Sequence, residues 1–464
     1  MSKWYLKPFN CPHTPLDLYS KLYCADQSFF LLSSLRSHEN SRFSYLSCYP
    51  VMTISAKKDT VLIHANGTVQ NTQGNPFDVL RTLIAARNID FKFDKNSLGV
   101  NFFSGGAVGY WGYDLKDFLE KLPSSARDDS DRPDAYWMLF DGLIVIDHFT
   151  DKYYLTGTEE AIDHLEQKMK KDPDDRLLSP DDFDYRIEAV TSKDSYLKKI
   201  GNIKECIANG DVYEVNLAQR FNIKIENKTE WADFKIFKSL VETSPSPFSA
   251  ILKCGEFSVI SSSPERFLSV RDGSIESKPI KGTRPRSSDF FEDEANYFDL
   301  LNNPKDRAEN VMIVDLVRND LGRVSETGSV QVPHLCRIEK YSTVFQMVST
   351  IRSKLESGKD YMDAIKACFP PGSMTGAPKI RAMEIIEELE EFKRGIYSGA
   401  LGYMGHNGDL DLSVVIRTLI LKGDEGYFQT GGAIVWDSEP EKEYQECLDK
   451  AQGIINALEK LKNK

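Results

Sequence analysis

The chain of 464 residues has no apolar run long enough to cross a membrane, since about 18 consecutive apolar residues are needed. Its first residues read MSKWYLKPFNCPHTP and lack the continuous apolar core that defines a signal peptide. We therefore expect a cytoplasmic protein without a membrane partner.

Paired cysteines are also missing. The 8 cysteines stand singly, with no CxxC or CxxH spacing. A zinc framework or a disulfide scaffold needs such pairs, so both are excluded, and we expect buried, reduced thiols.

The chain also lacks an excess of positive charge. The formal net charge is −12. A nucleic acid or an anionic membrane surface would repel such a chain, and an anionic small molecule would need a local basic pocket. The composition, with 41% hydrophobic and 28% charged residues, is that of a globular protein with a large core.

The chain divides at residues 166–188, where charge and proline dominate and apolar periodicity disappears. Before this linker, residues 1–165 contain short alternating runs and an Asn-Gly signal at 66–67, which predict antiparallel sheet. After it, residues 189–464 alternate helical and strand-like runs. The two parts form either separate domains or one two-part unit.

Two helices with acidic faces are predicted in the second part. An asparagine at 302 or 303 can cap the first, which begins near Pro304, ends at Gly322 and places Asp306 and Glu309 on one face. Its predicted apolar face runs through 311, 313, 314, 316 and 317.

The second acidic helix is predicted to begin at Ser438, where SEPE forms a capping box with Glu441. Glu443, Glu446 and Lys450 lie on one stripe of this helix. Each acidic face is either an ordinary solvated surface or, if the two helices meet, a set of carboxylates suited to Mg²⁺ and an anionic ligand.

Four further positions have two interpretations each. The loop PPGSMTGAPK before a helix can offer backbone N–H groups to an anion, although many helix entries look alike. Arg417, within an apolar run, is either salt-bridged or faces a carboxylate ligand. Glu265 is either a surface cap or a general acid.

Lys281, in the turn KPIKGT, is either solvated or a nucleophile. To act as a nucleophile it must lose its proton. We expect the neighbouring cations at 278, 284 and 286, together with a bound divalent cation, to lower its pKa.

These pieces occur in motifs that run through nearly the whole chain. They are GGAVGYWGYDL (105–115), GDVYEVNLAQRF (210–221), SPSPF (244–248), SSPERF (262–267), PIKGTRPR (279–286), KDRAENVMIVDLVRNDLGRV (305–324), PGSMTGAPK (371–379) and GGAIVWDSEPEKEYQE (431–446). In these motifs the chain closely resembles the chorismate-utilising enzymes.

The resemblance implies an α+β fold of two stacked antiparallel β-sheets wrapped by helices, with chorismate and Mg²⁺ bound between them. It implies Glu309 and Glu446 as metal ligands, with Asp306 and Glu443 holding the metal's waters. It implies Glu265 as the general acid that protonates the departing C4 hydroxyl. The implied substrate contacts are Ser373, Gly376, Tyr397, Arg417, Gly431, Gly432 and Lys450.

Lys281 distinguishes branches of this family. The motif PIKGT resembles the aminodeoxychorismate synthases that use covalent catalysis, whereas anthranilate synthases usually have PIAGT. The resemblance therefore implies that a Lys281 adduct at ring C2 directs ammonia to C4, giving 4-amino-4-deoxychorismate for p-aminobenzoate and folate synthesis. The alternatives are the C2 amination with pyruvate loss of anthranilate synthase component I, and a non-catalytic chorismate-binding scaffold.

The sequence departs from the family pattern at Glu214, Gln346 and Ala433. Ammonia-using relatives generally have glutamine where Glu214 stands, so the handling of ammonia is the step this departure affects. The chain has no GxCxG motif with a downstream His-x-Glu, and the resemblance implies ammonia from a separate glutamine amidotransferase. Residues 30–46, FLLSSLRSHENSRFSYL, resemble the segment that binds tryptophan in relatives, as a regulatory site, a structural site or an empty pocket.

Overall fold

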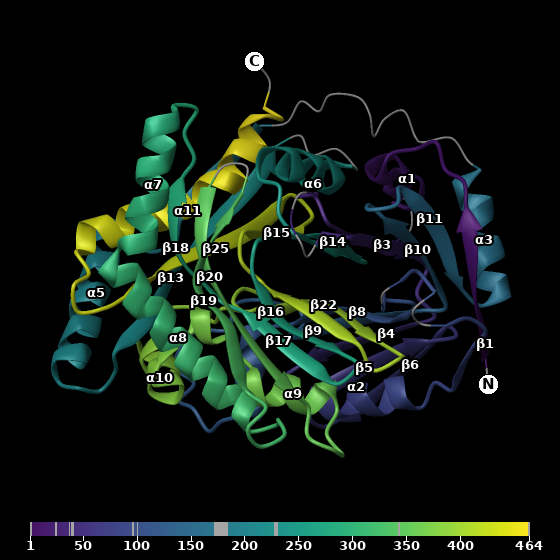
Figure 1. Cartoon of the computed structure of the whole chain (residues 1–464), viewed down its shortest axis with the longest axis horizontal. Coiled ribbons are helices and arrows are strands. Elements are labelled where there is room, and N and C mark those ends of the chain that lie inside the picture. Colours follow the sequence, from purple (N-terminus) through teal and green to yellow (C-terminus); the bar gives the residue numbers. More distant parts are fainter. Residues whose placement is uncertain are drawn as a thin grey trace.

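The strands of the protein form two sheets that lie face to face, with helices outside them (Figure 1). The computed structural model describes residues 2–23, 26–36, 38, 41–94, 97–99, 101–170, 184–226, 231–341 and 344–462. Nearly all strand pairs in these ranges are antiparallel; β1 and β7 pair in parallel. The predicted fold class is confirmed.

The first sheet combines strands from both ends of the chain. Its order is β12 (Asp184–Ala189), β13 (Glu214–Glu226), β25 (Glu425–Ile434), β24 (Thr418–Lys422), β15 (Phe257–Ser263), β14 (Phe248–Cys254), β2 (Gln27–Leu32), β3 (Phe43–Cys48), β10 (Gly142–Asp147), β11 (Lys152–Gly157), β1 (Ser2–Phe9) and β7 (Ile89–Phe91), with β21 (Gly376–Ala377) on β13.

The second sheet is mixed in the same way. Its order is β18 (Ile280–Pro285), β20 (Val344–Lys354), β17 (Ser274–Lys278), β16 (Arg266–Arg271), β23 (Leu410–Val414), β22 (Ala400–Gly405), β8 (Gly106–Trp111), β9 (Ala135–Phe140), β4 (Met52–Lys57), β5 (Thr60–Ala65) and β6 (Thr68–Gln73), with β19 (Gln331–Lys340) on β20.

The helices cover the outer faces of the sheets. They are α1 (Pro15–Leu22), α2 (Pro76–Ala85), α3 (Glu159–Met169), α5 (Lys193–Ala208), α6 (Ala232–Thr243), α7 (Phe290–Asn302), α8 (Pro304–Gly322), α9 (Tyr361–Cys368), α10 (Lys379–Leu389) and α11 (Pro440–Glu459), with the 3₁₀ turns η1 (Tyr113–Phe118) and η2 (Gly372–Met374).

Three large apolar clusters hold these layers together. One lies between the first sheet and α1, α3, α5, α6, α10 and α11, and another between the second sheet and α2, α8 and α9. The third fills the space between the sheets and includes Val145, Ala250, Val108 and Leu401. Helices from both parts of the chain thus share cores with strands from both parts.

Local sequence signals explain several elements. The Asn-Gly pair between β5 and β6 has positive φ at both Asn66 (52°) and Gly67 (72°), which is the two-residue turn that fits the twist of a hairpin. Asn303 caps α8 by accepting hydrogen bonds from the backbone N–H of Lys305 and Asp306, as the sequence predicted.

The predicted start of the last helix is wrong. α11 begins at Pro440, its N-cap is Glu439, and it has no side-chain cap bond. The Ser438 hydroxyl instead accepts a hydrogen bond from the backbone N–H of Val435, 3.0 Å away, so it closes the preceding turn. The predicted apolar face of α8 is also wrong at Val311, which is 45% exposed.

The predicted division into residues 1–165 and 189–464 remains a prediction, and residues 171–183 of its linker lie outside the described ranges. Cys24 also lies outside them; the seven other cysteines are free thiols, five of them buried. In the described part of the chain, no helix is long and apolar enough to span a membrane.

Candidate active site

The predicted site residues come together at one end of the sandwich, where the two sheets approach each other. β13 and β25 bring residues from the first sheet, and β18 and the start of β16 bring residues from the second. α8 packs against β18 and η2, and α11 packs against β25 (Figure 1). Segments far apart in sequence thus contribute to one site.

A buried ion pair joins the two sheets at this point. The Lys281 Nζ on β18 donates a hydrogen bond to Glu214 Oε1 on β13, 2.6 Å away. Lys281 is 8% exposed and Glu214 is 0% exposed. Lys281 is therefore not a solvated turn lysine.

The side chains around Lys281 do not by themselves lower its pKa as expected. Burial, the largest effect, lowers this pKa, but Glu214, Glu309 and Glu265 raise it and prevail. Of the cations expected to lower it, Arg284 pairs with Asp299 and Asp306, and Arg286 pairs with Asp293. Lys281 is thus a protonated amine that needs a proton acceptor before it can act as a nucleophile.

Glu265 lies buried just before β16, as a general acid requires. Its Oε1 accepts a hydrogen bond from the Ser373 hydroxyl of η2, 2.6 Å away. Burial raises the pKa of Glu265 to about 7, against the lowering effects of Ser373 and Lys281. A carboxyl with this pKa can hold a proton near neutral pH and release it to a reacting group.

The four predicted metal-site carboxylates are contributed by α8 and α11, and each faces a cationic side chain. Lys305 Nζ lies 3.2 Å from Glu443 Oε1 and 3.9 Å from Glu309 Oε1, so it bridges the two helices. Arg284 contacts Asp306 at 2.8 Å and Lys450 contacts Glu446 at 2.7 Å.

These residues fit a hard cation in their chemistry. Burial, the largest effect, raises the pKa of Glu309 to about 7, and the nearby Glu214 and Asp306 also raise it. A divalent cation would favour the charged carboxylate and reverse this shift. Across the described residues, no three His, Cys, Asp or Glu side chains are grouped closely enough to hold a metal as they stand.

The glycines of β25 bring bare backbone close to these acids. A side chain at Gly432 would lie within 3.5 Å of Glu443 Oε2 and 3.8 Å of Glu446 Oε1. The Gly431 carbonyl accepts a hydrogen bond from Lys450 Nζ, 2.9 Å away. The backbone here is therefore open to a ligand beside the acidic helices.

Gly376 has a different role, because it lets β21 approach β13. Its φ is +143°, and a Cβ there would lie 2.1 Å from the Glu214 carbonyl oxygen. Only glycine permits this contact, which pairs Gly376 with Val215 and fixes the backbone next to Glu214.

Arg417 and Tyr397 are two of the predicted contacts to substrate carboxylates, and both come from the C-terminal part of the chain. Burial lowers the pKa of Arg417, and among the described residues no carboxylate forms a salt bridge with its guanidinium. The salt-bridge interpretation of Arg417 is therefore not supported. Tyr397 is 3% exposed, with the buried guanidinium of Arg394 5.9 Å from its ring centre.

Sequence reasoning missed three contributors. Arg394 is 1% exposed and donates to the carbonyls of Met374 and Asn216, tying the PGSMTGAPK loop to β13. Lys305 bridges the acidic helices, and Asn216 has a buried side chain on β13, two residues after Glu214. A lysine next to the acidic motif could have suggested the bridge, whereas the Arg394 contacts join segments distant in sequence.

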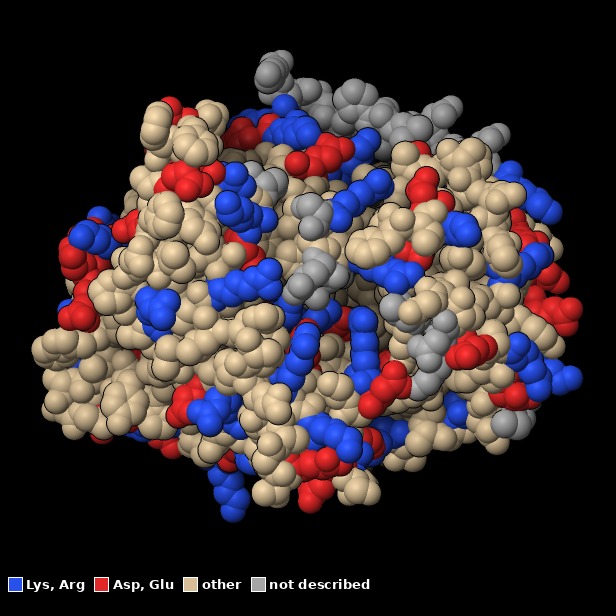
Figure 2. Space-filling view, in the orientation of Figure 1, with Lys and Arg blue, Asp and Glu red and all other residues tan. Residues whose placement is uncertain are grey.

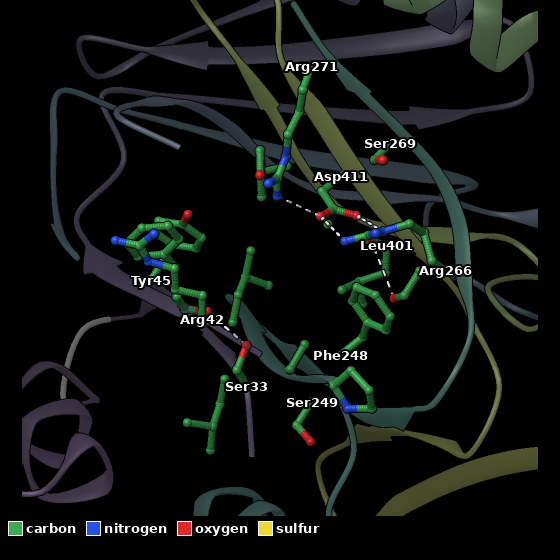
Figure 3. Close-up of a pocket in the computed structure, with 18 of the residues that line it drawn as sticks. Ser33, Arg42, Tyr45, Phe248, Ser249, Arg266, Ser269, Arg271, Leu401 and Asp411 are labelled. Atoms are coloured by element: carbon green, nitrogen blue, oxygen red, sulfur yellow. Dashed lines mark hydrogen bonds and ion pairs between the residues drawn. The ribbon is translucent and has the colours of Figure 1, made fainter. Parts of the chain in front are cut away.

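A separate cavity of about 500 Å³ lies between the sheets, lined in part by the predicted tryptophan segment. Ser33, Arg42 and Tyr45 lie on one side of it, and Arg266 and Arg271 converge on Asp411 across from them (Figure 3). Residues 37, 39 and 40 of that segment lie outside the described ranges. Figure 2 shows lysine and arginine side chains gathered around a hollow near the centre of one face, despite the negative net charge.

Comparisons with known proteins identify the family of this chain. A family model described as chorismate binding enzyme matches residues 27–456. The chain is 36% identical over 469 residues to anthranilate synthase component 1 of Acetivibrio thermocellus, covering 96% of this chain and 93% of that protein. It is also 36% identical over 460 residues to aminodeoxychorismate synthase component 1 of Bacillus subtilis strain 168, covering 96% and 94%.

A solved structure is similar as well. Anthranilate synthase component I from Streptococcus pneumoniae superimposes with a TM-score of 0.79 at 31% identity, covering 89% of this chain and 92% of that one.

Proposed function

Since this chain belongs to the family of chorismate binding enzymes, we propose that it aminates chorismate at C4 and forms 4-amino-4-deoxychorismate. It is a chorismate-utilising enzyme of the type shared by aminodeoxychorismate synthase component 1 and anthranilate synthase component 1. Identity alone favours neither product, because relatives of both names are 36% identical. The choice between C4 and C2 depends on the site.

The observation that carries the proposal is Lys281 itself. A buried lysine at the centre of the site, 2.6 Å from a carboxylate, has both a nucleophilic atom and a proton acceptor. An enzyme that adds ammonia directly to C2 has no need of a second nitrogen nucleophile in this position. A non-catalytic scaffold would need neither Lys281 nor the buried Glu265.

The proposed reaction is a double displacement. Lys281 gives a proton to Glu214, and its freed electron pair forms a bond to C2. The two ring double bonds shift, the C4–O bond breaks, and the departing oxygen takes the proton of Glu265 and leaves as water. Glu214 then passes the proton of the lysine to the Glu265 carboxylate. Ammonia forms a bond to C4, the double bonds shift back, and the C2–Nζ bond breaks with its electrons staying on Lys281.

Substrate binding is proposed to use the groups on the acidic helices and the neighbouring loops. Arg417, Tyr397 and Lys450 and the backbone at Gly431 and Gly432 would contact the two carboxylates of chorismate. Mg²⁺, held by Glu309 and Glu446 with Asp306 and Glu443 binding its waters, would supply positive charge for the ring carboxylate. The approach of Glu309 on α8 and Glu443 on α11 to the same Lys305 ammonium supports a site for a cation between the two helices.

Two partners belong to the proposal. The relatives are named as component 1, which supports a separate subunit, and we propose that this subunit is a glutamine amidotransferase that supplies ammonia. The cavity beside Ser33 is large enough for an aromatic amino acid, and we propose tryptophan as its occupant.

A covalent adduct tests the proposed function. With chorismate and Mg²⁺ but without ammonium, the protein should gain the mass of chorismate less one water, and peptide mapping should place the gain on Lys281. Lys281→Arg keeps the positive charge beside Glu214 but cannot form the adduct, so it is the matched control and should gain no mass. Amination at C4 in a Lys281→Ala variant would contradict the covalent role.

A further inference from the structure

Two buried oxygen atoms on β13, one of them on the carboxyl that contacts Lys281, have no hydrogen-bond partner among the described residues. They are Oε2 of Glu214, whose side chain is completely buried, and Oδ1 of Asn216, which is 5% exposed. A buried acceptor without a donor destabilises the folded protein. Two of them on one short stretch of strand indicate a ligand that supplies donors.

Strand geometry places both side chains on the same face of β13. Residues two apart on a strand point the same way and lie about 6.6 Å apart along it. The intervening Val215 and the next residue, Leu217, are buried in the cluster on the opposite face. The two oxygens therefore point towards the space between the sheets, where Lys281 lies.

The backbone that carries them is held on several sides. The Asn216 carbonyl accepts from Arg394, 2.8 Å away, and its N–H donates to the Thr375 carbonyl, 2.9 Å away. β13 is also paired with β25 on one side and β21 at its start. The two acceptors are thus fixed before any ligand arrives.

The charges around them define the ligand. Lys281 of β18 contacts Glu214, while the carboxyls of Glu309 on α8 and Glu265 before β16 also face this pair. An anion would be repelled by these groups, and an apolar group would leave both oxygens unsatisfied. A small cation with several N–H donors would be attracted by these carboxylates and could donate to both oxygens.

We propose that Glu214 and Asn216 bind the incoming nitrogen nucleophile as ammonium, and that Glu214 passes one of its protons to the departing lysine. The inference rests on the proposed function. It gives a role to the carboxylate at 214, where ammonia-using relatives generally have glutamine. Near neutral pH most free ammonia is ammonium, which has four donors and no acceptor, matching the two unpartnered oxygens.

The proton transfers balance, because Glu214 is a carboxylate again when ammonium binds. Ammonium gives one proton to Glu214, and its freed electron pair forms the bond to C4. The two ring double bonds shift, the C2–Nζ bond breaks with its electrons returning to Lys281, and Lys281 takes the proton from Glu214. The product carries a C4 ammonium group, Lys281 is a protonated amine again, and Glu214 is again a carboxylate.

The pH dependence of ammonium binding in the native protein tests this directly. If ammonium is the bound species, the KM for total ammonia stays constant between about pH 7 and pH 8.5, below the pKa of ammonium. If neutral ammonia is bound instead, this KM falls about tenfold per pH unit, and the proposal is overturned. This measurement needs no variant.

Glu214→Gln removes the charge and keeps the size of the side chain. Its KM for ammonium should rise about 10- to 100-fold, since a charge-assisted hydrogen bond is lost, and should now fall with rising pH. The Lys281 adduct should form more slowly, because glutamine cannot take the proton of the lysine, and the adduct that does form should persist at ammonium concentrations that clear it in the native protein. An unchanged KM for ammonium would mean that Glu214 serves Lys281 alone, and would overturn the proposal.

Glu387→Gln is the matched control, because Glu387 is a buried carboxylate paired with Lys116 and Lys393 outside this site. It should leave the KM for ammonium unchanged. The two proposals fail differently. If the native protein forms no adduct and aminates C2, the proposed function fails, whereas the KM for ammonium in Glu214→Gln still decides whether this ammonium site exists.

Discussion

Glu265 sets the expected pH dependence at the scale of single residues. As a general acid it must be protonated, and its pKa is raised to about 7, chiefly by burial. The protonated fraction therefore falls as the pH rises through 7. We expect kcat/KM for chorismate, measured at saturating ammonium, to fall about tenfold per pH unit on the alkaline side.

Ser373→Ala should raise the pH at which kcat/KM for chorismate begins to fall, here called the alkaline limb of the pH profile. The Ser373 hydroxyl donates to the charged form of Glu265 and so lowers its pKa; without that bond, the limb should move upward by about one pH unit. A limb that stays near pH 7 in the variant would contradict this role of Ser373.

Lys305 should oppose metal binding, because its ammonium lies between Glu443 and Glu309. Lys305→Gln should lower the Kd for Mg²⁺ in calorimetric titration. The side chain is 43% exposed and its charge is screened by solvent, so we expect a change of about threefold. Lys442→Gln is the control, since Lys442 pairs with Glu439 at the start of α11. Weaker Mg²⁺ binding in Lys305→Gln would show that Lys305 supports the site.

The sequence predicted the residue types of the site better than their partners. The motif around Glu265 allowed a general acid, and burial gives this residue the raised pKa that the predicted role requires. It did not predict the contact of Lys281 with Glu214, which are 67 positions apart. Only the approach of the two sheets brings them together, so the raising effect of Glu214 on the Lys281 pKa could not be predicted from the local motif.

At the scale of elements, the pairing of β21 with β13 depends on Gly376. Gly376→Ala would place a methyl group against the Glu214 carbonyl at an unfavourable φ, and we expect a loss of about 3 kcal/mol in unfolding free energy. Gly201→Ala is the control, because Gly201 lies inside α5 with open space around it, and should stabilise by about 0.5–1 kcal/mol. Urea unfolding measures both, and equal stability of the two variants would contradict the expectation.

Helix signals in the sequence predicted α8 well because its cap is local. Asn303, Pro304 and Gly322 lie at the ends of the helix that they specify. The start of α11 failed because Ser438 has an alternative backbone donor in the turn before the helix. A pattern alone cannot show which donor a serine will use.

At the scale of the whole molecule, both sheets contain strands from either side of residues 166–188. β14 pairs with β2 in the first sheet, and β22 pairs with β8 in the second. Separating the two parts would expose strand edges and the cluster between the sheets. We therefore expect a single unfolding transition in calorimetry, with equal calorimetric and van't Hoff enthalpies. Two independent transitions would contradict this expectation.

Periodicity could predict antiparallel strands in residues 1–165, but not their partners in the second half. Strands such as β2 and β14 are paired by packing between distant segments, and the order of apolar and polar residues within each strand does not specify its partner. The prediction of two stacked sheets therefore came from the family resemblance and not from the periodicity of apolar residues.

The identity of the product tests the central proposal most directly. The purified protein is incubated with chorismate, Mg²⁺ and ammonium, pyruvate is assayed, and the aminated product is identified by chromatography and mass spectrometry. We predict an aminated chorismate without pyruvate, and none from Lys281→Ala. Anthranilate with one pyruvate per product would contradict the proposal and would make Lys281 a bystander in an enzyme that aminates C2.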